Sequence, residues 1–219
     1  RQRRASSASR HAVGAKFDAR FGKECTRASL GSVDAFISHS WHDDADLRWE
    51  ALQAWRRAFV AAHGREPTVW FDGLCIVQKP ELIARQLASL PVYLAGCRTL
   101  LVLRGASYTT RLWCLLELFI FSEMGAGPDQ IHVARLADRD TALGRGARSG
   151  WSGSTPAGLR GAAAPMESRM SLAGFDVRNA MTSDPRDRQA LLAVIENAGA
   201  GADAFNAWAR PMLARGLSM

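Results

Sequence analysis

The stretch RTLLVL, residues 98–103, decides the fold class. Its last four residues are all apolar, so an extended chain would turn apolar side chains to both faces of a sheet. A strand covered on both faces is typical of a parallel sheet, because crossover connections place helices on each side of it. The stretch therefore predicts a buried parallel strand in an α/β protein.

The segments on both sides of this strand alternate between the periodicities of strands and helices. Short apolar runs predict strands, and apolar residues three or four apart between capping residues predict helices. Strands that alternate with helices indicate βαβ units and an open parallel sheet. We expect strands at 33–40, 68–71, 98–103, 131–136 and 174–180, and helices at 43–64, 82–96, from 112 onward, 183–199 and 202–213.

The net charge of +7 is concentrated at the start of the chain. Residues 1–30 contain eight basic and two acidic side chains, which leaves 20 basic and 19 acidic side chains for the rest. Because this Ser-, Ala- and Arg-rich segment lacks apolar periodicity, we expect a basic disordered linker over 1–31 rather than a specific nucleic-acid-binding arm. Residues 32–215 are expected to form a single domain, with a Gly/Ala/Ser-rich loop or insertion at 138–174.

Several functional classes are disfavoured. No apolar run approaches the roughly 20 residues of a membrane span, and no secretory segment is present, so we expect a cytoplasmic protein. The tract SHSWHD at 38–43 lacks the G-x-S-x-G turn of a serine hydrolase. Without a CxxC pair, the cysteines predict reduced thiols and no metal site; they are Cys25, Cys75, Cys97 and Cys114.

The run RLWCLLELF at 111–119 places one carboxylate among apolar residues. If the segment is helical, residues three or four apart share a face, so Glu117 lies in the apolar stripe beside Trp113. Burial of an unpaired charge is unfavourable. The pattern therefore predicts that Glu117 either faces a cleft or has a buried partner, for which Arg104 and Arg111 are candidates.

Two motifs resemble the TIR (Toll/interleukin-1 receptor/resistance) domain family. DAFISHSW at 34–41 resembles the family's first strand, and WCLLEL at 113–118 resembles its Trp-Cys-x-x-Glu-Leu helix, in the family's order and approximate spacing. VWFDGLCIVQ at 69–78 lacks the loop common in plant and animal members and is more similar to divergent TIR-like domains. The resemblance covers 32–136 and implies a flavodoxin-like open parallel sheet of about five strands, with helices on both faces.

The resemblance also implies a site. TIR domains that hydrolyse NAD place the glutamate of this helix in a crevice, which would make Glu117 catalytic and NAD the substrate, with no cofactor required. A carboxylate stabilises the oxocarbenium-like cation that forms as nicotinamide leaves, although apolar neighbours favour the neutral acid. Arg104 and Arg111 are candidates to pair with the pyrophosphate. The strand-end rule, by which open α/β sheets bind ligands at the carboxyl ends of their strands, points to residues 38–41, to 104–108 and to the start of the helix that carries Glu117. By position in the family, the resemblance implies the candidate substrate-binding residues Ser38, Ser40, Trp41, Trp70, Asp72 and Trp113.

Three functions remain open from the sequence. The first is an intracellular signalling domain that self-associates through homotypic TIR–TIR contacts and cleaves NAD to nicotinamide and ADP-ribose. The second is a non-catalytic homotypic adaptor, since many TIR domains retain this glutamate and act only by binding one another. The third is a nucleoside ribosyl-transfer enzyme, which would also need a glutamate beside an anomeric carbon. Candidate assembly surfaces are the apolar faces of residues 43–64 and 82–97.

Overall fold

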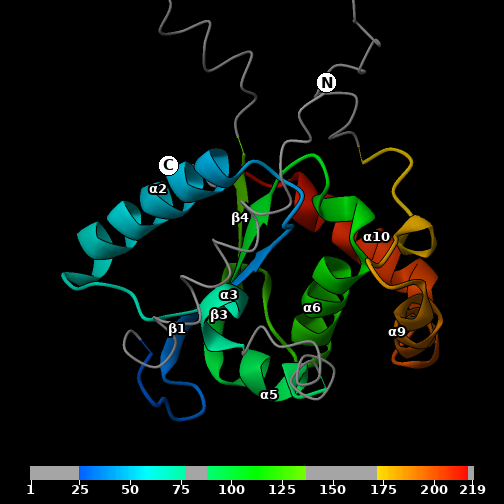
Figure 1. Ribbon diagram of the computed structural model, residues 1–219, viewed down its shortest axis with the longest axis horizontal. Coiled ribbons are helices and arrows are strands. Elements are labelled where there is room, and N and C mark those ends of the chain that lie inside the picture. The colour runs from blue at the N-terminus through cyan, green and yellow to red at the C-terminus, as the bar shows by residue number, and fades with distance from the viewer. Residues whose placement is uncertain (1–24, 77–87, 137–171, 217–219) are drawn as a thin grey trace, which may run out of the picture.

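The computed structural model describes residues 25–76, 88–136 and 172–216. Its strands and helices alternate along the chain, and every strand pair in the sheet is parallel (Figure 1). The strands form one open sheet in the order β2-β1-β3-β4, which confirms the predicted α/β class and parallel sheet. They are β1 (Val33–His39), β2 (Val69–Trp70), β3 (Cys97–Arg104) and β4 (Ile131–Arg135).

Some predicted segments lie wholly or largely outside the described residues. These are most of the basic linker at 1–31, most of the Gly/Ala/Ser-rich segment at 138–174, and the first part of the helix expected at 82–96. The described part of that helix is α5 (Leu90–Ala95).

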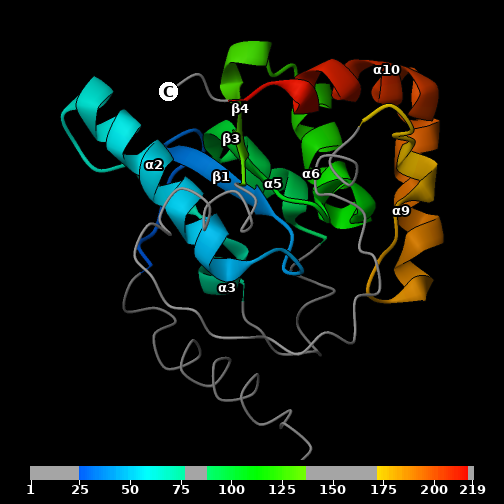
Figure 2. The ribbon, with the colours of Figure 1, turned by 90° about the horizontal axis from the view of Figure 1, so that it is seen from above.

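The sheet is covered on both faces, and each face contributes to its own apolar cluster. On β3, Leu101 and Leu103 join one cluster with Trp55, whereas Leu100 and Val102 join the other. This alternation explains why the strand must be apolar at consecutive positions. Figures 1 and 2 show α2 on one side of the sheet and α6 on the other. The longer helices are α2 (Ala45–His63), α6 (Leu112–Glu123), α9 (Pro185–Asn197) and α10 (Gly201–Ala214).

Helix α2 begins and ends at capping residues that the sequence indicates. Asp44 Oδ1 accepts hydrogen bonds from the backbone N–H groups of Asp46 and Leu47, at 3.0 and 3.1 Å. The helix ends at Gly64, whose φ of 68° is a left-handed conformation that suits glycine. Trp55 is buried against the sheet, so the apolar face of α2 belongs to the core and is not available for assembly.

The prediction of a fifth strand over 174–180 is wrong. Residues Val177–Asn179 form the 3-10 helix η3, because polar side chains bind the backbone N–H groups that a strand would pair. Asp176 accepts a hydrogen bond from the N–H of Arg178, at 2.9 Å. Asn206 of α10 accepts one from the N–H of the first residue of η3, also at 2.9 Å. The described residues therefore contain a sheet of four strands.

The C-terminal helices follow the sequence prediction. Asp184 caps α9 by accepting a hydrogen bond from the N–H of Arg186, and α10 buries Phe205 and Met212 in the core. No helix in the described ranges has the length and apolar character needed to cross a bilayer. Three shorter elements are α3 (Asp72–Cys75), η1 (Tyr108–Thr110) and η2 (Pro128–Gln130).

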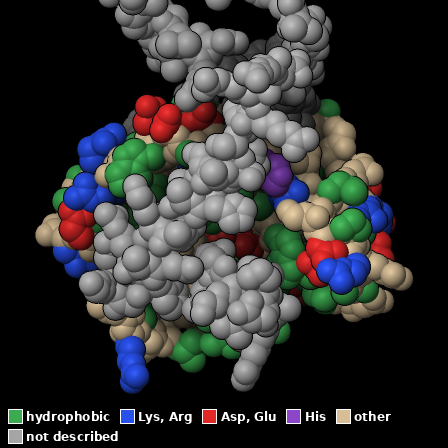
Figure 3. All heavy atoms as spheres, viewed as in Figure 1, with side chains coloured by type: hydrophobic (Ala, Val, Ile, Leu, Met, Phe, Trp, Pro, Cys, Tyr) green, Lys and Arg blue, Asp and Glu red, His purple; other side chains and the backbone are tan. Residues whose placement is uncertain are grey.

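The distribution of surface charge and the free state of the cysteines also agree with the sequence predictions. Figure 3 shows basic and acidic side chains side by side over α2 at one edge and over α9 at the other, as expected for a nearly neutral domain. All four cysteines are free thiols.

Candidate functional site

A cavity of about 360 Å³ opens at the carboxyl end of the sheet. Its walls come from the loop after β1, from α3 after β2, and from α6 after β3. The direction of strand addition reverses at β1, and open α/β sheets bind ligands at such a point. Six of the seven residues that the sequence suggested line this cavity: Ser40, Trp41, Trp70, Asp72, Trp113 and Glu117.

The seventh residue, Ser38, holds the Glu117 carboxyl group. Its hydroxyl donates a hydrogen bond to Glu117 Oε2 at 2.6 Å, and its side chain is fully buried at the end of β1. Ser38 therefore contacts the acid rather than opening toward a ribose or phosphate. Behind it, the hydroxyl of the fully buried Tyr108 lies 2.7 Å from Ser38 Oγ and 3.2 Å from the carbonyl oxygen of Cys114.

The environment of Glu117 favours its neutral form. Removal of the carboxyl group from bulk water raises its pKa to about 8, and the negative charge of Asp72 acts in the same direction. The hydrogen bond from Ser38 acts in the opposite direction, because it stabilises the carboxylate. At neutral pH the acid in the empty cavity is therefore mostly protonated.

A second wall of the cavity is built from aromatic rings around Asp72. Trp41 donates its indole N–H to Asp72 Oδ2 at 2.8 Å, and its side chain is 54% exposed at the mouth of the cavity. The buried His39 ring meets Trp41 edge-on at 4.8 Å between centroids, and its Nε2 lies 3.4 Å from Asp72 Oδ1. Burial lowers the pKa of His39, so this ring is neutral near pH 7.

Trp70 and Trp113 complete the aromatic lining. Trp70 stacks against Phe36 at 4.3 Å and against Tyr93 at 5.0 Å between ring centroids, which fixes the orientation of its indole. Trp113 is half-buried one helical turn before Glu117. Aromatic faces around one acidic group suit a planar heterocyclic ligand, and they suit a cationic one best.

The two arginines that were candidates for an anionic group have different positions. Arg111 lines the cavity and donates a hydrogen bond to Ser183, which precedes α9. Arg104 is 2% exposed and donates to the carbonyl oxygen of Leu213 at 2.8 Å, and burial lowers its pKa to about 10. Arg104 is not among the lining residues, so its proposed contact with a pyrophosphate is not supported by its position.

The loops after β1 and β3 are fastened to each other beside the cavity. Asp43 Oδ1 accepts hydrogen bonds from the backbone N–H of Ser107 at 2.9 Å and from its hydroxyl at 2.8 Å. That hydroxyl also lies 2.7 Å from Ser40 Oγ, at the cavity wall. Gly105 lets the loops approach this closely, since an added Cβ would lie 2.3 Å from the Asp43 carboxylate.

We expect Gly105→Ala to lower the free energy of unfolding by about 1–3 kcal/mol, because the new methyl group must displace the Asp43 carboxylate from Ser107. Thermal or denaturant unfolding measures the change. Gly174→Ala is the matched control, because a Cβ there meets no atom within 4 Å. Equal stability of the two variants would show that the contact between Asp43 and Ser107 does not stabilise the fold.

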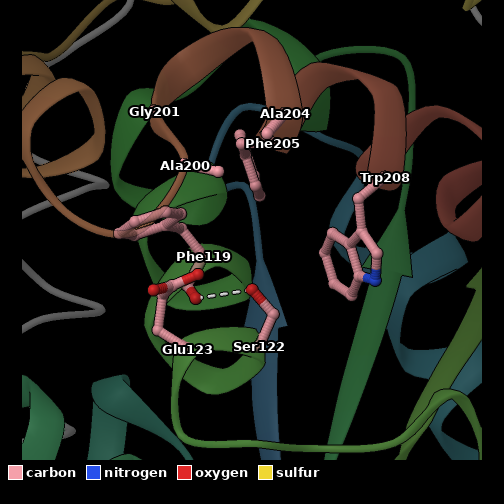
Figure 4. Close-up of a pocket in the computed structure, with 8 residues that line it drawn as sticks. All are labelled: Phe119, Ser122, Glu123, Ala200, Gly201, Ala204, Phe205 and Trp208. Carbon is pink, nitrogen blue, oxygen red and sulfur yellow. Dashed lines mark hydrogen bonds between the residues drawn. The ribbon is translucent and has the colours of Figure 1, made fainter.

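A different cavity, of about 260 Å³, lies at the other end of α6 (Figure 4). Phe119, Ser122 and Glu123 project from α6 toward Phe205 and the other residues at the start of α10. Ser122 donates its hydroxyl to the carbonyl oxygen of Phe119, within its own helix. Since both phenylalanine rings are buried in the core, this cavity offers less of a binding surface than the one at Glu117.

Sequence reasoning missed several residues of the site. The strand-end rule pointed to residues 104–108, but it did not single out Tyr108, which begins η1 after β3. Ser183 and Asp184 were expected only as the start of a helix, yet both line the cavity with Asp187. These residues belong to the far C-terminal part of the chain, and no local pattern indicates that it returns to the strand ends.

No family model matches this chain, and no curated protein matches it.

Proposed function

We propose that the chain is a divergent TIR-like domain that cleaves NAD to nicotinamide and ADP-ribose, with Glu117 as the catalytic carboxylate. The observation that carries this proposal is the position of Glu117 in the wall of a cavity of about 360 Å³ at the carboxyl end of a parallel sheet. That volume falls within the usual range for small-molecule sites. The strand order β2-β1-β3-β4 agrees with the first four positions of a flavodoxin-like sheet.

The reaction breaks the bond between the ribose C1′ and the pyridinium nitrogen. The bonding electron pair leaves with nicotinamide, and the ribosyl group becomes an oxocarbenium-like cation. A carboxylate at Glu117 stabilises this cation through its charge, and the low local polarity strengthens the interaction. Water then adds to C1′ and loses a proton, which gives ADP-ribose.

The other cavity residues have roles that follow from their positions. Trp41 and Trp113 line the cavity, and in this proposal their rings contact the nicotinamide ring. Asp72 orients Trp41 through the indole N–H. Arg111 is the lining arginine that could meet the pyrophosphate.

A nucleoside ribosyl-transfer enzyme is a second candidate, because carboxyl groups outnumber cationic side chains among the lining residues. Among the described residues, the lining contains four carboxyl groups and one guanidinium, that of Arg111; the carboxyl groups belong to Asp72, Glu117, Asp184 and Asp187. A pyrophosphate is repelled by such a lining, whereas a nucleoside with a cationic base is not. Parallel assays with NAD and nicotinamide riboside separate the two, since a nucleoside-specific site would cleave only the riboside.

Homotypic adaptor function is favoured by a different surface. Trp49, on the outer side of α2, is 61% exposed and borders a cavity of about 540 Å³ with Arg57 and Arg135. An exposed tryptophan in such a setting is typical of protein contact sites. We propose that self-association uses this side of α2, and size-exclusion chromatography of Trp49→Ala tests it.

The rate of NAD cleavage should rise with pH, and the rise should be half complete near pH 8. Catalysis requires the ionised Glu117, while burial holds its pKa at about 8, so each pH unit below the midpoint lowers the ionised fraction about tenfold. The pH dependence of kcat/KM measures this in the free enzyme. A profile that is flat between pH 5 and 9, in a protein that remains folded, would contradict the role of an ionised Glu117.

A further inference from the structure

A chain of three hydrogen bonds runs from the cavity into the core. It connects Glu117 Oε2 to Ser38 Oγ at 2.6 Å, Ser38 Oγ to the Tyr108 hydroxyl at 2.7 Å, and that hydroxyl to the carbonyl oxygen of Cys114 at 3.2 Å. Ser38 and Tyr108 are both fully buried. Three elements, β1, η1 and α6, each contribute a member, so the geometry is fixed by the fold.

The number of hydrogens available differs between the two forms of Glu117. The bond from Ser38 to Glu117 described above is the one that a carboxylate accepts, and it can reverse when the carboxyl group is protonated. Glu117 then donates to Ser38, Ser38 donates to Tyr108, and Tyr108 donates to Cys114, so every link is made. When it is ionised, Ser38 must donate to Glu117 and Tyr108 to Ser38. The phenol then has no hydrogen left for the carbonyl oxygen of Cys114. The complete chain is therefore compatible only with the neutral acid.

We propose that Tyr108 is a positioning residue which, through Ser38, holds the Glu117 carboxyl group neutral while the cavity is empty, so that the group ionises when a cationic ring enters. The relevance of this device to catalysis rests on the proposed cleavage of NAD, whereas the protonation state can be measured without it. Burial, which raises the pKa of Glu117 to about 8, acts in the same direction.

Other charged and titratable groups around the cavity do not account for a neutral acid by pairing with it. The carboxyl group of Asp72 raises the pKa of Glu117, and the thiol of Cys114 is itself held neutral by burial. Arg111 donates to Ser183. Within the described ranges, the remaining such groups that line the cavity are His39, His42, Asp184 and Asp187.

Two substitutions test the connection from Tyr108 to Glu117. Tyr108→Phe removes two hydrogen bonds of the chain when Glu117 is neutral but only one when it is ionised. The neutral form is therefore destabilised more, and we expect the pKa of Glu117 to fall by about one pH unit. Ser38→Ala breaks the connection between Tyr108 and Glu117, so we expect Tyr108→Phe to leave the pKa of Glu117 unchanged in a Ser38→Ala background. Tyr93→Phe is the matched control, since it deletes the same phenol oxygen from a ring that packs against the cavity residue Trp70 but lies outside the hydrogen-bond chain.

Carbon-13 NMR of protein labelled at the glutamate carboxyl carbon measures these shifts directly. The signal that disappears in Glu117→Gln identifies the residue. We expect a midpoint near pH 8 in the wild type, a lower one in Tyr108→Phe, and no change in Tyr93→Phe. A wild-type midpoint near 4, or a Tyr108→Phe midpoint at or above that of the wild type, would overturn the proposal.

The response to a cationic ring is tested with 1-methylnicotinamide, which carries the pyridinium charge but has no glycosidic bond to cleave. We expect this compound to lower the midpoint of Glu117 and nicotinamide, its neutral counterpart, to leave it unchanged. If both compounds bind and shift the midpoint equally, the charge-dependent step is wrong. Since no turnover is involved, an absence of NAD cleavage would not affect either result.

Discussion

Glu117→Gln is expected to lower the rate of NAD cleavage about 10²–10³-fold, the usual effect of removing one group that stabilises a developing charge. The amide keeps the size of the carboxyl group and can still bond to Ser38, so the cavity and the fold should persist. What is lost is the negative charge beside C1′. Nicotinamide release, measured by chromatography at pH 8 to 9, reports the effect.

Glu123→Gln is the control for this experiment. Glu123 lies in the same helix, but it is exposed and borders the other cavity. We expect this variant to retain wild-type activity. Equal cleavage of NAD by Glu117→Gln and the wild type, in folded protein, would leave Glu117 with only a structural role. An absence of cleavage in both would favour the adaptor function.

The second large effect is expected at Asp34, at the opposite end of β1. Its carboxylate accepts hydrogen bonds from Arg65 Nη1 and Nη2, both at 2.7 Å, and from the N–H and hydroxyl of Thr68, at 2.8 and 2.9 Å. It is 5% exposed. Asp34→Asn should therefore lower the free energy of unfolding by about 2–3 kcal/mol, because an amide cannot accept all these bonds.

The same site makes stability depend on pH. The hydrogen bonds from Arg65 hold the pKa of Asp34 well below its usual range, so its contribution is fully present above about pH 4 and is lost as the pH falls further. Urea unfolding at pH 7 and pH 3 measures it. Asp129→Asn, at an exposed position in η2, is the control. If Asp34→Asn unfolds at the same urea concentration as this control at pH 7, the network does not stabilise the fold.

Local patterns predict much of this architecture. The apolar run of 98–103 indicates a strand buried on both faces, and its side chains do divide between the two clusters. Asp44 and Gly64 mark the ends of α2, because capping acts over only a few residues. The strand-end rule predicts a common site for Trp41 and the helix of Glu117, and both line one cavity.

Features that depend on tertiary contacts could not be predicted in this way. Ser38 was expected to contact substrate, but its hydroxyl is hydrogen-bonded to Glu117 on α6, 79 positions away. Residues 174–180 have the composition of a strand, but Asn206 binds the backbone of that segment and a 3-10 helix forms. Arg104 lies at the carboxyl end of β3, as a ligand-binding residue often does, yet it reaches the carbonyl oxygen of Leu213. In each case the deciding partner lies far away in sequence.

The central claim is that the cavity at Glu117 cleaves the glycosidic bond of NAD. It is tested most directly by incubating the protein, concentrated on a surface to promote self-association, with NAD at pH 8.5 and quantifying both products. The account predicts equal amounts of nicotinamide and ADP-ribose from the wild type and at most about one hundredth of these amounts from Glu117→Gln. Intact NAD after incubation with assembled, folded wild-type protein would contradict it.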